Sequence, residues 1–227
     1  MKRLLVGCLL LFMTIATYAQ KDITTFLGIP VDGTKVAMIQ KLISKGFVPK
    51  KAGKEEYLEG KYNGTDVLIY IVTNNDKVCR IMVSDVHHLN EAEIKIRFNK
   101  LVHQFENNEK YQTLEKYTLS ESENISHEMT VNHKKYDAIF YQVPIIEKLD
   151  TEALGKQVEN ELLKKYTPEE IATHSKTIDQ EADRIAAWIA TELMYKKMVW
   201  FRICDLHGKY FITMFYDNEY NKANGNN

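Results

Sequence analysis

Residues 57–84 read YLEGKYNGTDVLIYIVTNNDKVCRIMVS, and this stretch decides the fold. It contains three strand-like runs, at 57–62, 67–73 and 78–84. Asn63-Gly64, the strongest short signal for a β-hairpin, separates the first two runs. Asn74-Asn75-Asp76 then turns the chain into the third run. The stretch therefore predicts a three-stranded antiparallel meander.

An amphipathic helix is predicted on each side of this meander. The earlier helix follows capping residues at 31–34 and ends at Gly46, a residue suited to the position just after a helix. Its apolar residues recur at helical spacing: Val36, Ile39, Leu42 and Ile43. The later helix begins at Asn90, which forms a capping-box pattern with Glu93. Its apolar stripe consists of Ile94, Phe98, Leu101, Val102 and Phe105.

Four more strands are predicted in the second half of the chain. Two are expected at 125–131 and 136–143, on either side of a turn-like segment, 132–135. The other two form a final hairpin, 198–204 with 210–216, and a polar tail follows at 218–227.

Helices are predicted between these two pairs of strands. One is expected over 151–165, and Thr167-Pro168 opens another of nearly thirty residues, with the threonine as its cap. The apolar stripe of this longer helix is Ile171, His174, Ile178, Ala182, Ile185, Ile189 and Leu193, which makes His174 an expected interior histidine. Because the two helices present too much apolar surface to stand alone, we expect them to pack as a hairpin. Their stripes would face either the sheet or a second subunit, so an oligomer is one option.

Short internal similarities suggest a repeat. Residues 66–70 read DVLIY and residues 137–141 read DAIFY, and 77–81 has a weaker echo in 199–203. The predicted class is therefore α+β, with two helix-plus-antiparallel-meander units that form a sheet. The units are expected at 20–110 and 111–217, and the second carries a long helical insert at about 150–196. Chance similarity between short amphipathic strands is the alternative.

The first nineteen residues predict a signal peptide. Lys2 and Arg3 precede an apolar run, 4–16, that is too short to span a membrane as a helix. Ala19 offers a small residue at the cleavage site, so we expect a mature chain that begins at Gln20 and is soluble in the periplasm or secreted. In the alternative, Cys8 lies in a lipoprotein-like box, although most of the apolar run follows it.

Charge and cysteine content narrow the class of protein. The net charge of the 227-residue chain is −1, which argues against a nucleic-acid binder because such proteins are basic. After the leader, no stretch approaches 18 consecutive apolar residues, so no membrane span is expected. An oxidising compartment would permit one disulfide between Cys79 and Cys204, and buried free thiols are the alternative.

The search for catalytic and metal-binding motifs yields no site. Nucleophile-elbow, phosphate-loop and dinucleotide-binding patterns are absent from the sequence. His87-His88 could mark a metal site, but the side chains of adjacent residues point in different directions and would not share an ion. We expect these histidines to lie in a solvated turn. Asp217 and Glu219 resemble the start of a calcium loop, but Lys222 stands where that loop needs glycine. We therefore expect no metal, no cofactor and no catalysis, and the alternative is an enzyme whose site assembles from scattered residues.

Several short motifs carry a resemblance. The leader ending Tyr18-Ala19-Gln20, the segment 26–34 (FLGIPVDGT) and Lys45-Gly46-Phe47 resemble uncharacterised exported proteins of Bacteroides-type bacteria. The tandem helix-plus-meander plan is similar to the fold of β-lactamase-inhibitory proteins and of small envelope lipoproteins that help assemble outer-membrane barrels. The resemblance implies a noncatalytic binding role and brings no site residues with it. We expect an exported protein that binds an envelope protein or a small ligand, and the alternative is an inhibitor-like or assembly module that acts on another envelope protein.

Strand alternation predicts a binding face. Tyr70 and Tyr141 take equivalent places in the two similar strands, and Arg80 is matched by Arg202, which shares a strand side with Trp200. Tyrosine, tryptophan and arginine are the residue types enriched at interface hot spots. We expect these five residues to form a partner-binding surface. In the alternative, the helical insert covers them and they are ordinary core.

Overall fold

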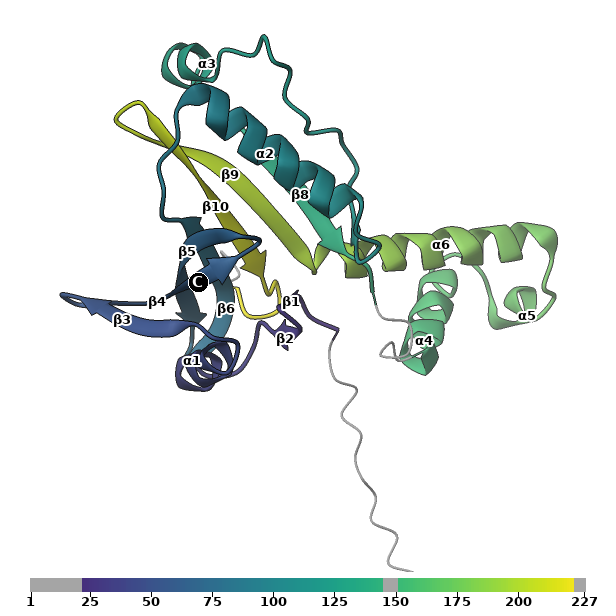
Figure 1. Cartoon of the computed structure of the whole chain (residues 1–227). Coiled ribbons are helices and arrows are strands. Elements are labelled where there is room, and N and C mark those ends of the chain that lie inside the picture. The colour runs from purple at the N-terminus through teal and green to yellow at the C-terminus, as the bar shows by residue number, and fades with distance from the viewer. Residues whose placement is uncertain (1–21, 145–150, 223–227) are drawn as a thin grey trace, which may run out of the picture.

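The structure is a computed structural model that describes residues 22–144 and 151–222. The predicted signal peptide, with Cys8, therefore lies outside the described residues. The fold belongs to the predicted α+β class, with helices beside a large antiparallel sheet (Figure 1).

The helices are α1 (Lys35–Ile43), α2 (Glu91–Glu106), α3 (Ile125–Val131), α4 (Thr151–Leu162), α5 (Pro168–Ile171) and α6 (Lys176–Tyr195). The strands before α2 are β1 (Thr25–Phe26), β2 (Ile29–Pro30), β3 (Val48–Ala52), β4 (Glu55–Tyr62), β5 (Thr65–Asn74) and β6 (Lys77–Asp85). The later strands are β7 (Tyr111–Gln112), β8 (Asp137–Gln142), β9 (Met198–Leu206) and β10 (Lys209–Asp217).

The predicted meander is confirmed as β4, β5 and β6. Asn63 and Gly64 have φ of 50° and 77°, the left-handed backbone that a tight hairpin turn requires. Gly60 lets Phe47 pack on β4, since a Cβ on this glycine would lie 2.4 Å from the Phe47 ring. The final hairpin is also confirmed, and His207 and Gly208 repeat the positive φ at its turn.

The main sheet of the described chain has the order β3-β4-β5-β6-β10-β9-β8-β7, and its paired strands are antiparallel. The order is symmetric about the central β6–β10 pair. That symmetry makes β5 the counterpart of β9, whereas the sequence similarity at 66–70 and 137–141 relates β5 to β8. The repeat suggested by the sequence therefore stays a prediction.

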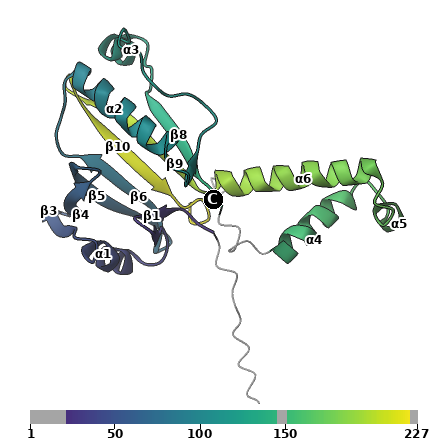
Figure 2. The same ribbon diagram turned by 45° about the vertical axis from the view of Figure 1, so that its right-hand side comes forward.

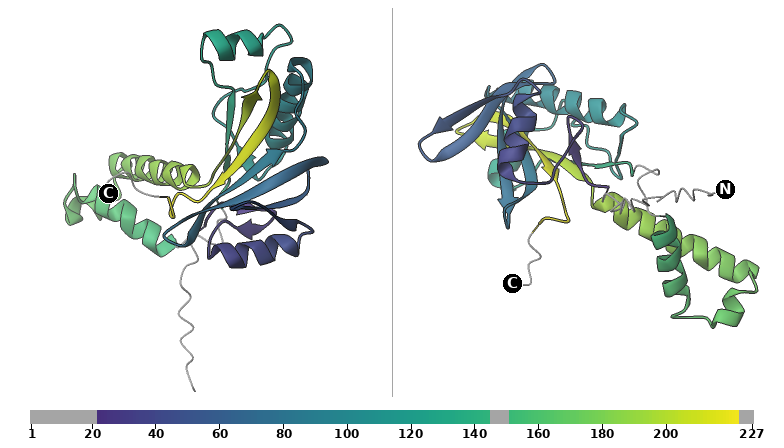
Figure 3. Two further views of the ribbon diagram at one scale, coloured as in Figure 1. Left: turned by 90° about the vertical axis from the view of Figure 1, so that its left-hand side faces the viewer. Right: turned by 90° about the horizontal axis from the view of Figure 1, so that it is seen from below.

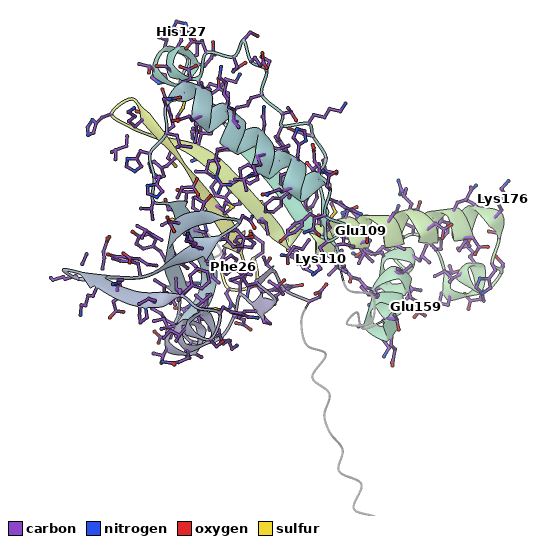
Figure 4. All side chains as sticks on the ribbon, in the orientation of Figure 1. Phe26, Glu109, Lys110, His127, Glu159 and Lys176 are labelled. Atoms are coloured by element: carbon purple, nitrogen blue, oxygen red, sulfur yellow. The ribbon has the colours of Figure 1, made fainter. Side chains whose placement is uncertain are left out.

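One face of this sheet is covered by α1 and α2 (Figure 3). Both helices begin at the predicted caps, because Thr34 accepts a hydrogen bond from the Ala37 amide and Asn90 forms the full capping box with Glu93. Alternate strand residues meet the helices here and are buried, such as Ile69, Ile81, Phe140, Phe201 and Met214. Phe26, labelled in Figure 4, joins this core and contacts the rings of Phe47, Tyr62 and Tyr216.

Two predicted elements are wrong. Residues 125–131, expected as a strand, form α3, because the Asn124 side chain accepts a hydrogen bond from the His127 amide and caps a helical turn. The long helix expected from Pro168 is two helices. The chain breaks at His174, which has φ of 47° and is exposed rather than interior, and α6 restarts at Lys176.

Residues 151–196, here called the arm, project from the body instead of lying on the sheet (Figure 2). In Figure 4, Glu159 lies on α4 and Lys176 at the far end of the arm. The predicted hairpin packing of α4 against α6 is present, around a small core of Leu162, Ile185 and Ile189. The arm thus has a core of its own, separate from that of the sheet.

The segment Asp22–Val31 is tied to the far end of the chain. Lys197, at the junction between arm and sheet, forms an ion pair of 2.9 Å with Asp22, and both side chains are buried. The Thr24 hydroxyl donates a hydrogen bond to the Asp217 carbonyl oxygen, and the Asn218 side-chain amide donates one to the Val31 carbonyl oxygen. These contacts join the two ends of the described chain at one edge of the body.

Candidate functional site: the open face of the sheet

The sheet surface opposite α1 and α2, here called the open face, carries side chains in cross-strand rows. The central row, from β5 to β8, is Tyr70, Met82, Phe215, Trp200 and Ile139. A second row is Leu68, Ser84, Thr213, Arg202 and Asp137. A third set lies on the other side of the central row from the second row. In it, Arg80 is in register with Val72 and with Asp217, and Met198 is in register with Tyr141. Most of these side chains are half-buried. In Figure 3, α1 and α2 lie on the other face of the sheet, and α6 meets the open face at its β8 end, where Tyr195 contacts Tyr141.

An aromatic stack lies at the centre of the open face. The rings of Trp200 and Phe215 are nearly parallel, with centroids 3.9 Å apart. The Arg80 guanidinium lies over the Phe215 ring at 5.0 Å, and the Arg202 guanidinium lies over the Trp200 ring at 5.2 Å. Two cations therefore flank two stacked rings, each within the range of a cation–π interaction.

Asp217 fixes one side of this cluster. Its fully buried carboxylate accepts two hydrogen bonds from Arg80, at 2.5 and 3.0 Å, and one from the Trp200 indole N–H at 2.9 Å. Lys222 lies 3.0 Å from the same carboxylate. Burial opposes ionisation of Asp217, but the hydrogen bonds from Arg80 and Trp200 outweigh it and hold the pKa of the carboxyl below its ordinary value. Asp217 is therefore a permanent anion near neutral pH.

Asp137 fixes the other side. It accepts two hydrogen bonds from Arg202, at 2.6 and 2.7 Å, and these raise the pKa of the guanidinium. A bidentate pair of this kind sets the plane of the arginine as well as its position. Both guanidinium groups are thus held over the rings, although about a third of each side chain is exposed.

Tyrosine pairs extend the surface at both ends. Tyr57 contacts Tyr70 on the β4 side, with ring centroids 5.8 Å apart. On the β8 side, Tyr141 meets Tyr195 of α6 edge to face, at 5.1 Å. Trp188 lies seven residues before Tyr195, two helical turns along the same side of α6, and is 52% exposed. The aromatic surface therefore continues from the sheet onto the arm.

Three of the five predicted site residues, Arg80, Trp200 and Arg202, come together in this cluster. Tyr70 lies in the central row, and Tyr141 lies two residues from that row on β8. All five are half-buried. The arm reaches one of them, since Tyr195 of α6 contacts Tyr141. Whether they bind a partner stays a prediction.

Sequence reasoning missed Asp217, Phe215, Tyr195 and Trp188. Asp217 drew attention only as part of a failed calcium loop. Its role depends on β10 lying between β6 and β9, and this strand order has no local signature in the sequence. Trp188 lies outside the apolar stripe of the predicted helix, and a large aromatic residue at such a position was the one clue that the sequence offered.

The predicted disulfide option is wrong, since Cys79 and Cys204 are both free thiols. Cys204 is paired with Phe211, whereas the neighbour of Cys79, Arg80, is paired with Asp217. Six residues of extended strand correspond to roughly 20 Å, well beyond the Cα separation that a disulfide spans. Burial raises the pKa of both thiols, which lowers their reactivity.

Comparison of the chain with protein-family models, with curated proteins and with solved structures finds no match. Within residues 22–144 and 151–222, no group of three histidine, cysteine, aspartate or glutamate side chains is arranged to hold a metal ion. No helix in that part of the chain combines the length and apolar composition needed to cross a membrane.

Proposed function

We propose that this chain is an exported, noncatalytic binding protein of the bacterial envelope, and that the open face receives a partner protein. The single observation that carries the proposal is the Trp200–Phe215 stack, flanked by Arg80 and Arg202 on the sheet face opposite α1 and α2. Large aromatic side chains and arginine dominate the energetics of protein interfaces because each buries much area and keeps a polar group available.

Rigidity of the cluster supports this proposal. Holding each arginine by a bidentate carboxylate before a partner arrives reduces the rotamer entropy that binding would otherwise cost. The same pairs neutralise the charge of the face. A partner therefore needs apolar and hydrogen-bonding groups, and no strong net charge, at the point of contact.

The shape of the surface favours a protein over a small molecule. The pockets between α1 and β3, over β4 and β5, and on α2 include neither Trp200 nor Phe215 nor the two arginines. Small ligands are usually held in concave sites, whereas a broad aromatic surface suits another protein. The resemblance in plan to β-lactamase-inhibitory proteins points the same way.

The arm would form a second contact. Trp188 and Tyr195 share one side of α6, and Tyr195 touches Tyr141 on the open face. A partner resting on the sheet would meet the base of the arm at Tyr141, and a larger one would reach Trp188.

Export is supported by the leader at residues 1–19. Cleavage after Ala19 would leave intact the contacts of Asp22 and Thr24 that anchor the segment 22–31. The proposed mature chain therefore keeps every interaction of this segment described above.

The experiment is site-specific photocrosslinking in the native envelope. A benzoylphenylalanine at Val72, which is 41% exposed beside Arg80, should give a discrete adduct with one envelope protein. The matched control is the same group at Ile96 on α2, which is 69% exposed on the helix-covered side and should give none.

A second substitution tests the role of the cluster. Adding Trp200→Ala to the Val72 probe should reduce the adduct at least fivefold while the protein stays folded, as judged by its thermal transition. Equal adducts from Val72 and Ile96, or an adduct that Trp200→Ala leaves unchanged, would contradict the proposal. An adduct made only of two copies of this chain would identify the face as a self-association surface instead.

A further inference from the structure

A groove on the helix-covered side lies between α1 and the edge strand β3, far along the sheet from the Trp200 cluster. It has a volume of about 290 Å³. Apolar side chains line it, among them Ile39, Pro49, Leu58 and Ile71, and Leu58 and Ile71 belong to the core of the sheet. Ile39 borders the groove from α1, and the exposed Val36 and Ile43 continue this apolar surface along the helix.

The rim of the groove is cationic. Residues 35–54 contain six lysines and no acidic residue, and three of these lysines, Lys35, Lys50 and Lys51, line the groove. Glu56 is the one carboxylate in the lining and lies 3.5 Å from Lys35. Lys50 lies 3.9 Å from Glu59, and Lys51 has no ion pair within the described residues. The rim thus keeps a net positive charge beside an apolar floor.

We propose that this groove binds an anionic amphiphile, a single acyl chain with a carboxylate or similar headgroup. The chain would lie on Ile39, Leu58 and Ile71, and the headgroup would be met by Lys35 and Lys51. The volume lies at the lower end of the range for small-molecule sites, which suits one chain rather than a whole phospholipid.

An extended peptide suits the groove less well. A peptide that adds a strand needs free backbone donors and acceptors at a sheet edge. β3 is such an edge, but Pro49 lacks an N–H group, and proline and lysine on edge strands oppose strand addition. The groove therefore offers apolar contact and charge, with little backbone pairing.

Calorimetric titration of the exported protein with monomeric dodecanoate tests the proposal. Dodecanoate should bind with one-to-one stoichiometry, and dodecyltrimethylammonium, which has the same chain and the opposite charge, should bind at least tenfold more weakly. Shortening the chain to octanoate should weaken binding about three- to fourfold for each methylene that the groove covers.

Paired variants separate the groove from general electrostatic attraction. Lys35→Gln with Lys51→Gln should weaken dodecanoate binding at least tenfold. Lys41→Gln with Lys45→Gln removes the same charge from nearby positions that do not line the groove, and should change binding less than twofold. Equal effects of the two pairs, or equal affinity for the two headgroups, would overturn the proposal.

Vesicles distinguish a free amphiphile from a membrane surface. Cosedimentation with phosphatidylglycerol vesicles, together with no binding of monomeric dodecanoate, would also overturn the proposal. If a lysine variant unfolds, the comparison of headgroups and chain lengths on the unaltered protein still decides the outcome.

Discussion

At the scale of single residues, Asp217 organises the open face. One buried carboxylate holds Arg80, Trp200 and Lys222, which come from β6, from β9 and from the segment after β10. Removing its charge would leave Arg80 without the carboxylate that holds it and Lys222 with Glu219 alone, while the shape of the site stays nearly the same. Asp217→Asn therefore isolates the electrostatic contribution of this residue.

Asp217→Asn should lower the free energy of unfolding by about 3 kcal/mol at pH 7, the lower end of the cost of breaking a buried ion pair, because both cations are partly exposed. The folded-state pKa of Asp217 lies below the unfolded-state value of about 3.9. Its stabilisation is therefore complete above that pH and is lost as the pH falls through the folded-state pKa. Urea unfolding between pH 7 and pH 2 should show the variant and the parent converging, and a constant difference would contradict this assignment.

Trp200 contributes both a ring and a donor. Trp200→Phe keeps a ring on Phe215 and loses the hydrogen bond to the charged Asp217, so it should cost about 2 kcal/mol. Trp200→Ala also loses the stacked ring and should cost about 3 kcal/mol, the lower limit for truncating a large aromatic residue in a core. Equal losses in chemical denaturation would mean that the stacked ring does not stabilise the fold.

At the scale of elements, a substitution in the arm tests whether α4 and α6 fold independently of the sheet. Ile185→Asp places a charge in the small core formed with Leu162 and Ile189, so α4 and α6 should separate at a cost of several kcal/mol. Far-UV circular dichroism should lose helical signal, and limited proteolysis should cut within 151–196, while the sheet keeps its unfolding transition.

Ala186→Asp is the matched control for this change, since Ala186 is the next residue and is exposed. It should leave the helical signal and the cleavage pattern as they are. Loss of the sheet transition with Ile185→Asp would show that arm and sheet fold as one unit, contrary to the separate cores described above.

Elements with strong local signals could be predicted from the sequence, and those decided by distant contacts could not. Asn63-Gly64 and the Asn90–Glu93 capping box fix a turn and a helix start within a few residues, and both are present. Residues 125–131 have the alternating pattern of a strand, yet they form α3, whose first turn is capped by the Asn124 side chain. Their own pattern does not decide between strand and helix. The candidate site could be predicted in part. Strand alternation placed Arg80 and Trp200 on the correct face of the sheet, whereas the role of Asp217 could be predicted only by knowing that β10 lies between β6 and β9.

At the scale of the whole molecule, the predicted signal peptide can be tested on the protein itself. Protein recovered from the envelope should begin at Gln20 and carry no lipid, and intact mass spectrometry measures both. A diacylated product beginning at Cys8 would contradict soluble export, and an uncleaved product would contradict the signal peptide.

β10 occupies the middle of the sheet, although it is the last strand of the described chain. It pairs with β6 on one side and β9 on the other, and the Ser84–Thr213 contact joins residues 129 positions apart. Before residues 209–217 are in place, β6 and β9 each lack a partner strand on one side, and no strand joins the two halves of the sheet. The sheet can therefore close only when this last strand is free to enter it. For the export proposed above, the sheet would close only after residues 209–217 had left the secretion channel.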